Sequence, residues 1–206
     1  MSTARLTRAG ALLAASLLLS SCAGVGSRSE PANCPVTPVP TVELSGVELR
    51  ARVHFTIGSE EAHLEAIARS TPEELRIVGI AAYGTRLFAV HQRGREIRVE
   101  GASSRKSEFL ALWTLDALHR SIWIHTPTTA GSGPVVSWNR ENERVTESIE
   151  AGERHREFTR PRASAPVRVR TANSDAAASR FEVQNPWCGY EAVIAVVDSA
   201  AGPSGE

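Results

Sequence analysis

The sequence predicts a mainly β fold of the α+β class, in which about ten antiparallel strands form a sheet and one helical region packs against it. Two patterns predict this class. From residue 47 onward, short segments that alternate apolar and polar residues recur between turn residues, a spacing typical of an antiparallel sheet or barrel. Residues 107–124 instead place their apolar side chains at helical spacing, with no Gly or Pro inside.

The chain begins with a segment, residues 1–21, that resembles a lipoprotein signal peptide. Arg5 and Arg8 precede an apolar run over 9–19, which is shorter than the ~20 residues of a transmembrane helix. The run ends in Leu-Ser-Ser-Cys at 19–22, which resembles a bacterial lipobox. The resemblance implies cleavage before Cys22 and its lipidation, which would attach the chain to a membrane. The alternative is an ordinary secretory signal followed by an incidental cysteine.

Residues 22–41 are expected to form a flexible tether, because they are rich in Gly, Ser and Pro and show no apolar period. Ala23, not Asp, follows the lipobox cysteine. The sorting preference of bacterial lipoproteins then implies the periplasmic face of the outer membrane. A folded domain is expected over 42–198 and a disordered tail over 199–206.

The domain is expected to start with its most regular strand. Residues 47–57 alternate strictly, with apolar side chains at each odd position, which predicts a half-buried antiparallel strand. The same reasoning predicts strands over 47–57, 63–68, 74–80, 85–91, 96–100, 135–138, 144–149, 154–159, 166–171, 180–184 and 190–197.

The helical region is expected over 107–124, with Ser107 as its N-cap. Phe109, Leu112 and Trp113 lie at i, i+3 and i+4, and further apolar residues widen the stripe. A helix that is apolar on so broad a face is buried on more than one side. We therefore expect it to lie against the sheet.

The charge balance gives no reason to expect nucleic-acid binding. Without Arg5 and Arg8, the mature chain would carry 21 basic and 23 acidic residues, whereas nucleic-acid binding requires a basic surface. If Cys22 is lipidated, Cys34 and Cys188 remain as an even pair in an oxidising compartment. The sequence leaves open whether this pair forms a disulfide, because it does not show how far apart the two Cα atoms lie.

No constellation of residues predicts catalysis, so we expect a protein that is not an enzyme. The six histidines show no metal-ligand spacing, and we expect no metal or other cofactor. His54 and His91 are interpreted as solvated side chains on outward strand faces. Ser132 lies between two glycines but lacks the strand–turn–helix context of a nucleophile elbow.

Arginines alternate with other residues in the last third of the chain, at 154, 156, 160, 162, 168 and 170. Alternation on strands places such side chains on one face. We interpret them as a solvated outer face paired with Glu150, Glu153 and Glu157. The alternative is a surface that contacts anionic lipid headgroups.

Three stretches carry a resemblance to a known group of proteins. They are 74–80 leading into 83–88, the segments 110–113 and 115–118, and Asn185 followed by Gly189-Tyr190. In this order, residues 44–197 resemble an uncharacterised family of bacterial lipoproteins related to the LolA/LolB lipoprotein carriers. The resemblance implies a curved antiparallel half-barrel whose concave side holds a helical lid. It also implies binding or transfer of acylated or other hydrophobic cargo, with a periplasmic carrier protein as a partner.

The expected lipid contacts are apolar side chains on the inward faces of the strands and on the lid helix. An acyl chain needs a groove free of water, and burial of each CH2 contributes ~0.8 kcal/mol without any catalytic group. Alternation does not say which strand face is concave, so the set is open to a shift by one residue. The alternative function is a non-catalytic adaptor that binds a partner protein. The expected lipid-binding residues are Val53, Phe55, Leu75, Ile77, Phe88, Val90, Leu112 and Trp113.

Overall fold

A computed structural model describes residues 34, 36–44, 46–127, 133–172 and 179–201. All of them belong to one unit, 33–206. The predicted signal peptide and Cys22 lie outside the described residues. The elements are η1 (Thr41–Leu44), β1 (Val47–Ile57), β2 (Glu60–Ser70), β3 (Leu75–Ile80), β4 (Arg86–Arg93), β5 (Glu96–Glu100), α1 (Arg105–Leu118), η2 (His119–Trp123), β6 (Val135–Arg140), β7 (Glu143–Glu150), β8 (Glu153–Thr159), β9 (Val167–Ala172), β10 (Arg180–Asn185) and β11 (Tyr190–Ala201).

The eleven described strands form one curved, unclosed antiparallel sheet, in the order β5-β4-β3-β2-β1-β11-β10-β9-β8-β7-β6. Each strand pairs with its neighbours in the sequence except where α1 interrupts the chain between β5 and β6. The first and last strands, β1 and β11, pair in the middle of the sheet, so β5 and β6 are its two edges. The predicted mainly β, antiparallel fold is confirmed.

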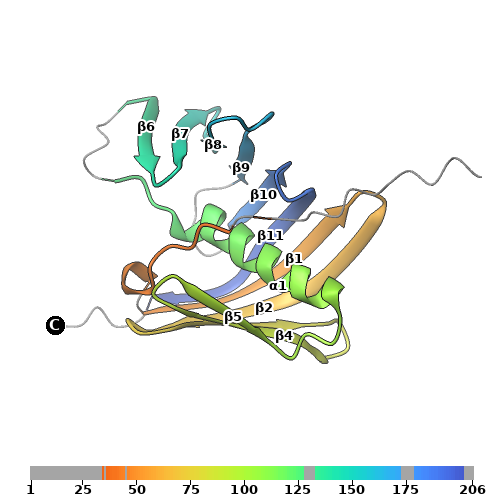
Figure 1. The fold of residues 1–206 in the computed structure, drawn as a ribbon. Coiled ribbons are helices and arrows are strands. Elements are labelled where there is room, and N and C mark those ends of the chain that lie inside the picture. Colours follow the sequence, from red (N-terminus) through yellow and green to blue (C-terminus); the bar gives the residue numbers. More distant parts are fainter. Residues whose placement is uncertain (1–33, 35, 45, 128–132, 173–178, 202–206) are drawn as a thin grey trace, which may run out of the picture. The chain divides into compact units, whose positions relative to one another are not determined.

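The helix α1 runs across the concave face of the sheet (Figure 1). Odd positions of β1, including Val53 and Phe55, are buried on this side, while even positions are largely exposed. The alternation in the sequence did not show which face of β1 is concave. Burial of the odd positions beneath α1 identifies the concave face. The helix therefore covers the apolar face, as expected for a sheet with one solvated side.

The helical region starts earlier than predicted. Its N-cap is Ser104, not Ser107, because the Ser107 backbone N–H donates to Ser104 Oγ at 3.2 Å. The first helical residues, Arg105 and Lys106, are polar and exposed, so the apolar period did not reveal this first turn. After Leu118 the chain widens into the π-helical turn η2, which reaches Trp123.

The predicted tether ends earlier than residue 41. Val39 and Thr41 are buried, and η1 begins at Thr41. The Val39 N–H donates to His119 Nδ1 at 3.2 Å, and Gln92 Nε2 donates to the Val39 carbonyl oxygen at 2.5 Å. A proline-rich segment without an apolar period is thus held by the buried side chains of Pro38, Val39 and Thr41 and by backbone hydrogen bonds.

A disulfide joins Cys34 to Cys188, across 154 positions of sequence. Cys188 lies in the turn between β10 and β11, which starts at Asn185 and ends at Tyr190. At the other end of the chain, β11 continues to Ala201 beside β1. Residues 199–201 therefore belong to the sheet and not to the predicted tail, and residues 202–206 lie outside the described part of the chain.

Candidate functional site

A cavity of about 350 Å³ lies on the concave face, beside the end of the helical region at η2. Its size is at the lower end of the ~300–1,000 Å³ typical of small-molecule pockets. Its apolar wall is formed by Leu49, Ile122, Ile149, Phe181 and Val196. Its polar lining comes from Ser121, His125, Arg154, Arg156, Thr171, Ser179 and Ser199.

An irregularity in the pairing of β1 with β11 shapes one wall of this cavity. Arg50 pairs with Asp198, but the next residue, Ala51, pairs with Val196, so Val197 has no partner across the strands. An extra residue of this kind bends the strand and redirects neighbouring side chains. Val196 lines the cavity, whereas Val197 is 43% exposed.

One carboxylate organises the basic side chains at the cavity. Glu147 Oε2 accepts from Arg156 Nε at 2.6 Å, and Glu147 Oε1 lies 3.7 Å from Arg154 Nε. Thr126 Oγ1 also donates to Glu147 at 2.8 Å. Two guanidinium groups against one carboxylate leave an excess of positive charge beside an apolar wall.

The protonation states preserve this excess. Burial raises the pKa of Glu147, but the hydrogen bonds from Arg156 and Thr126 and the charges of Arg156 and Arg154 together outweigh burial, and the net pKa is lowered. Burial also lowers the pKa of His125, and the charges of Arg156 and Arg154 lower it further. At neutral pH, therefore, His125 is uncharged and Glu147 is ionised.

Ser121 presents a polar atom to the cavity that its own chain does not satisfy. Among the described residues, its Oγ is buried and has no hydrogen-bond partner, and Ser121 lines the cavity. Buried polar atoms are nearly always hydrogen-bonded in folded proteins. The hydroxyl is thus available to a polar group of a ligand.

A buried charged cluster fixes the helix end that forms the cavity. Arg120 donates to Asp116 at 3.0 Å and makes two hydrogen bonds to Glu143, at 3.1 and 3.0 Å. Asn185 and Tyr190 each donate to Asp116 at 2.8 Å. Because all of these side chains are buried and satisfied by one another, we assign the cluster to structure and not to ligand binding.

The predicted lipid-binding residues occupy a different part of the concave side. Seven of the eight are buried in the core; Leu112 is half-buried. The Trp113 ring lies 6.3 Å from that of Phe55, 5.8 Å from that of Tyr190 and 5.7 Å from that of Phe109. The space beneath Trp113 is therefore filled by the protein's own side chains, and none of the eight residues lines the cavity.

The alternating arginines were predicted to share one outer face, and this prediction is wrong for Arg156. Arg168 pairs with Glu157 at 2.8 Å and Arg170 with Glu153 at 2.9 Å on the outer face, as expected. Arg156, by contrast, is buried on the concave side. The pairing of Arg156 with Val169 places even positions of β8 beside odd positions of β9, and the sequence does not state this register.

The other expectations concern catalysis and membrane spanning. Ser132 lies outside the described residues, so the structure does not place it. Within the part of the chain that is described, no helix has the length and apolarity needed to cross a membrane.

Comparison with protein families identifies the family of the chain. A family model described as a protein of unknown function (DUF3261) matches residues 48–198, which extend from Glu48 in β1 to Asp198 in β11. No curated protein matches the chain.

Proposed function

The chain belongs to the DUF3261 family of proteins of unknown function, and from its own structure we propose a non-enzymatic protein that binds acylated or other hydrophobic cargo. The cavity beside η2 is the proposed binding site. Its combination of an apolar wall with an excess of arginine charge carries the proposal.

This combination matches an amphipathic ligand. An alkyl segment against Ile122, Phe181 and Val196 gains ~0.8 kcal/mol for each CH2 removed from water. An anionic headgroup placed toward Arg154 and Arg156 gains charge-assisted hydrogen bonds, which are the stronger kind. The cavity volume of about 350 Å³ suits one chain segment and not a whole diacyl lipid.

The proposed location rests on the resemblance of residues 19–22 to a bacterial lipobox. We propose that Cys22 is lipidated and that the domain faces the periplasm from the outer membrane, with acyl chains or lipid-linked cargo as its ligands. A relation to the LolA/LolB carriers, and exchange of cargo with a periplasmic carrier protein, are part of the same proposal. The curved, unclosed sheet with a helix on its concave side supports this relation.

Mass spectrometry of the full-length chain, purified from bacterial membranes, tests the proposal. Lipid that is covalently attached at Cys22 persists under denaturing conditions, whereas cargo held in the cavity is lost. We expect a non-denatured mass that exceeds the denatured mass by one acyl-bearing molecule. Val196→Trp is expected to abolish this excess, because the indole fills the cavity.

Val197→Trp is the matched control, since this neighbouring side chain is exposed and does not line the cavity. It should retain the bound species. Equal masses under both conditions for the unmodified chain, or equal loss in both tryptophan variants, would contradict the proposal.

The alternative function, an adaptor for a partner protein, is favoured by one observation. The edge strand β6 pairs on one side only, with β7, and its Val135 is 61% exposed. An open edge is a template for strand addition by another chain. In the mass experiment, a protein partner without any acyl species would favour the adaptor.

A further inference from the structure

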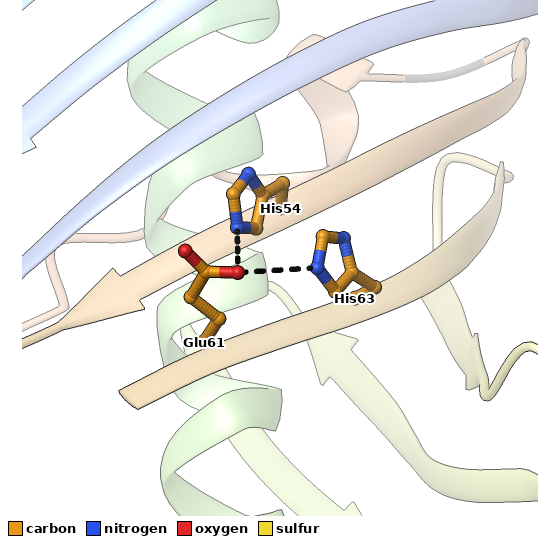
Figure 2. Close-up of side chains that lie close together, drawn as sticks. All are labelled: His54, Glu61 and His63. Atoms are coloured by element: carbon orange, nitrogen blue, oxygen red, sulfur yellow. Dashed lines mark ion pairs between the residues drawn. The ribbon is translucent and has the colours of Figure 1, made fainter. Parts of the chain in front are cut away.

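The outer face of the sheet carries two histidines and a glutamate whose side chains converge. His54 lies on β1, and Glu61 and His63 lie on β2 (Figure 2). Their potential ligand atoms all lie within 4.8 Å of one another. We propose that these three residues form a binding site for a divalent transition-metal ion, with Zn²⁺ as the best fit.

The register of the β1–β2 hairpin brings the three residues together. His54 pairs directly with His63, and Thr56 pairs with Glu61. Since residues two apart on a strand share a face, Glu61 and His63 point to the same side as His54. The strands are joined by a two-residue turn, 58–59, so their relative position is firmly set.

The distances suit a metal ion better than they suit the residues alone. Glu61 Oε2 lies 3.6 Å from His54 Nε2 and 3.7 Å from His63 Nε2, beyond ordinary hydrogen bonds. Around a tetrahedral Zn²⁺ with bonds of roughly 2.0–2.2 Å, two ligand atoms are roughly 3.3 Å apart. Both imidazole–carboxylate distances therefore exceed the separation expected around zinc by only a few tenths of an ångström.

A second observation points into the same site. Among the described residues, His54 Nε2 is one of the few side-chain nitrogen or oxygen atoms that are enclosed and without a hydrogen-bond partner. A neutral imidazole nitrogen with a free lone pair is a common metal ligand. The site thus holds an enclosed imidazole nitrogen that makes no hydrogen bond within the described part of the chain.

The donor set indicates the class of metal. Two imidazoles and one carboxylate suit Zn²⁺ and similar ions, while Ca²⁺ and Mg²⁺ require oxygen ligands. Three protein ligands leave further positions for water. Glu191, which is the other cross-strand partner of Thr56, adds negative charge to the same face.

The histidine rings must turn to bind the ion. They are stacked, with centroids 4.1 Å apart and an interplanar angle of 9°, so their lone pairs run parallel instead of converging. Rotation about the Cβ–Cγ bond is soft for histidine. His63, whose side chain is 65% exposed, has room for this rotation.

Titration of Zn²⁺ into the untagged, chelator-treated full-length chain tests the site by calorimetry. Co²⁺ serves as a second probe, because its visible absorption reports whether nitrogen and oxygen or thiolate ligands are bound. We expect one ion per chain and no thiolate band. His63→Ala should weaken binding by roughly 100-fold, at the upper end of the effects seen for supporting residues of metal sites.

His155→Ala is the matched control. His155 Nε2 lies 3.8 Å from Glu153 Oε2 on β8, which reproduces a histidine–glutamate pair without a second histidine. This variant should bind Zn²⁺ as the unmodified chain does, and Cys22 is the same in all three proteins. Absence of Zn²⁺ binding by the unmodified chain, or equal affinities of the His63→Ala and unmodified chains, would overturn the proposal.

Discussion

At the scale of single residues, the side chain of His119 connects three parts of the fold through its two ring nitrogens. Its Nδ1 accepts from the Val39 N–H, and its Nε2 lies 3.0 Å from Gln92 Oε1. Since Nδ1 accepts, Nε2 carries the proton and donates to Gln92. The neutral ring therefore satisfies both of its nitrogens and links η2 to β4 and to the segment before η1.

This arrangement predicts a specific loss of stability in mild acid. Burial lowers the pKa of His119 to about 3, with the charges of Arg140 and Arg120 adding to the effect, against an ordinary value of 6.5. Below pH 6.5 the unfolded chain binds a proton that the folded chain excludes, so the free energy of unfolding falls as the pH falls toward 3. The maximal slope of such a contribution is about 1.4 kcal/mol per pH unit.

Urea unfolding between pH 6.5 and 5 measures this contribution, because the range lies above the ordinary pKa of carboxylates. In His119→Gln, the fall in unfolding free energy should be smaller by roughly 1 kcal/mol per pH unit. The exposed-face variant His155→Gln should retain the slope of the unmodified chain. Identical slopes in all three proteins would show that His119 is not the buried titrating group.

Two features at the scale of residues could not be predicted from the sequence, the burial of Arg120 and the pairing of His54 with His63. In the sequence Arg120 resembles an ordinary polar residue on a helix. In the structure its side chain is 2% exposed and forms ion pairs with Asp116 and Glu143. A hydrophobic pattern does not reveal this buried charge, because the charge is compensated partly by Glu143, which lies 23 residues away in the sequence. The pairing of His54 with His63 was missed for another reason: it depends on the register of the β1–β2 hairpin and not on a short ligand spacing in the sequence.

Among the elements, the strands were the most predictable feature. Strand β1 was predicted with the bounds that the structure has, since a strand with one solvated face must alternate. The lining of the cavity was not predicted. Leu49, Phe181 and Val196 come from three strands, and their convergence depends on pairing register and on the irregularity at Val197.

In the strand pair β3–β4, the backbone of Gly79 lies close to the ring of Phe88, and this contact can be tested. Gly79 pairs with Phe88, and a Cβ at residue 79 would overlap the Phe88 ring. The ring of a cross-strand aromatic residue thus covers the glycine. Gly79→Ala should lower the free energy of unfolding by about 1–3 kcal/mol, as overpacking does.

A double variant separates this clash from a general effect of alanine. In Gly79→Ala/Phe88→Leu the smaller side chain makes room, so the two costs should be less than additive, with a coupling of about 1 kcal/mol. Gly133→Ala, whose Cβ would meet only the Val135 carbonyl oxygen at 3.7 Å, should be nearly neutral. Strict additivity of the two β3–β4 changes would contradict the assigned contact.

At the scale of the whole molecule, the Cys34–Cys188 bond closes a loop that contains nearly all of the sheet. A cross-link of this length limits the freedom of the unfolded chain and contributes up to about 4–5 kcal/mol in the chain-entropy account. We expect Cys34→Ser/Cys188→Ser to lower the urea midpoint and to keep the strand content of the unmodified chain. Circular dichroism monitors both.

Addition of a reductant provides the control, because it should shift the midpoint of the unmodified chain toward that of the double variant and leave the variant unchanged. An unchanged midpoint after complete reduction, verified by thiol counting, would show that the bond contributes nothing to stability.

The position of this bond also determines how the domain bears mechanical tension. A force applied from the N-terminal side can pass beyond Cys34 by two paths. The covalent path leads through the disulfide to Cys188, between β10 and β11 near the centre of the sheet. The parallel path through residues 36–40 depends on hydrogen bonds and on the buried side chains of Pro38 and Val39. The central strands therefore bear the force first, and the segment leading to η1 is protected from detachment.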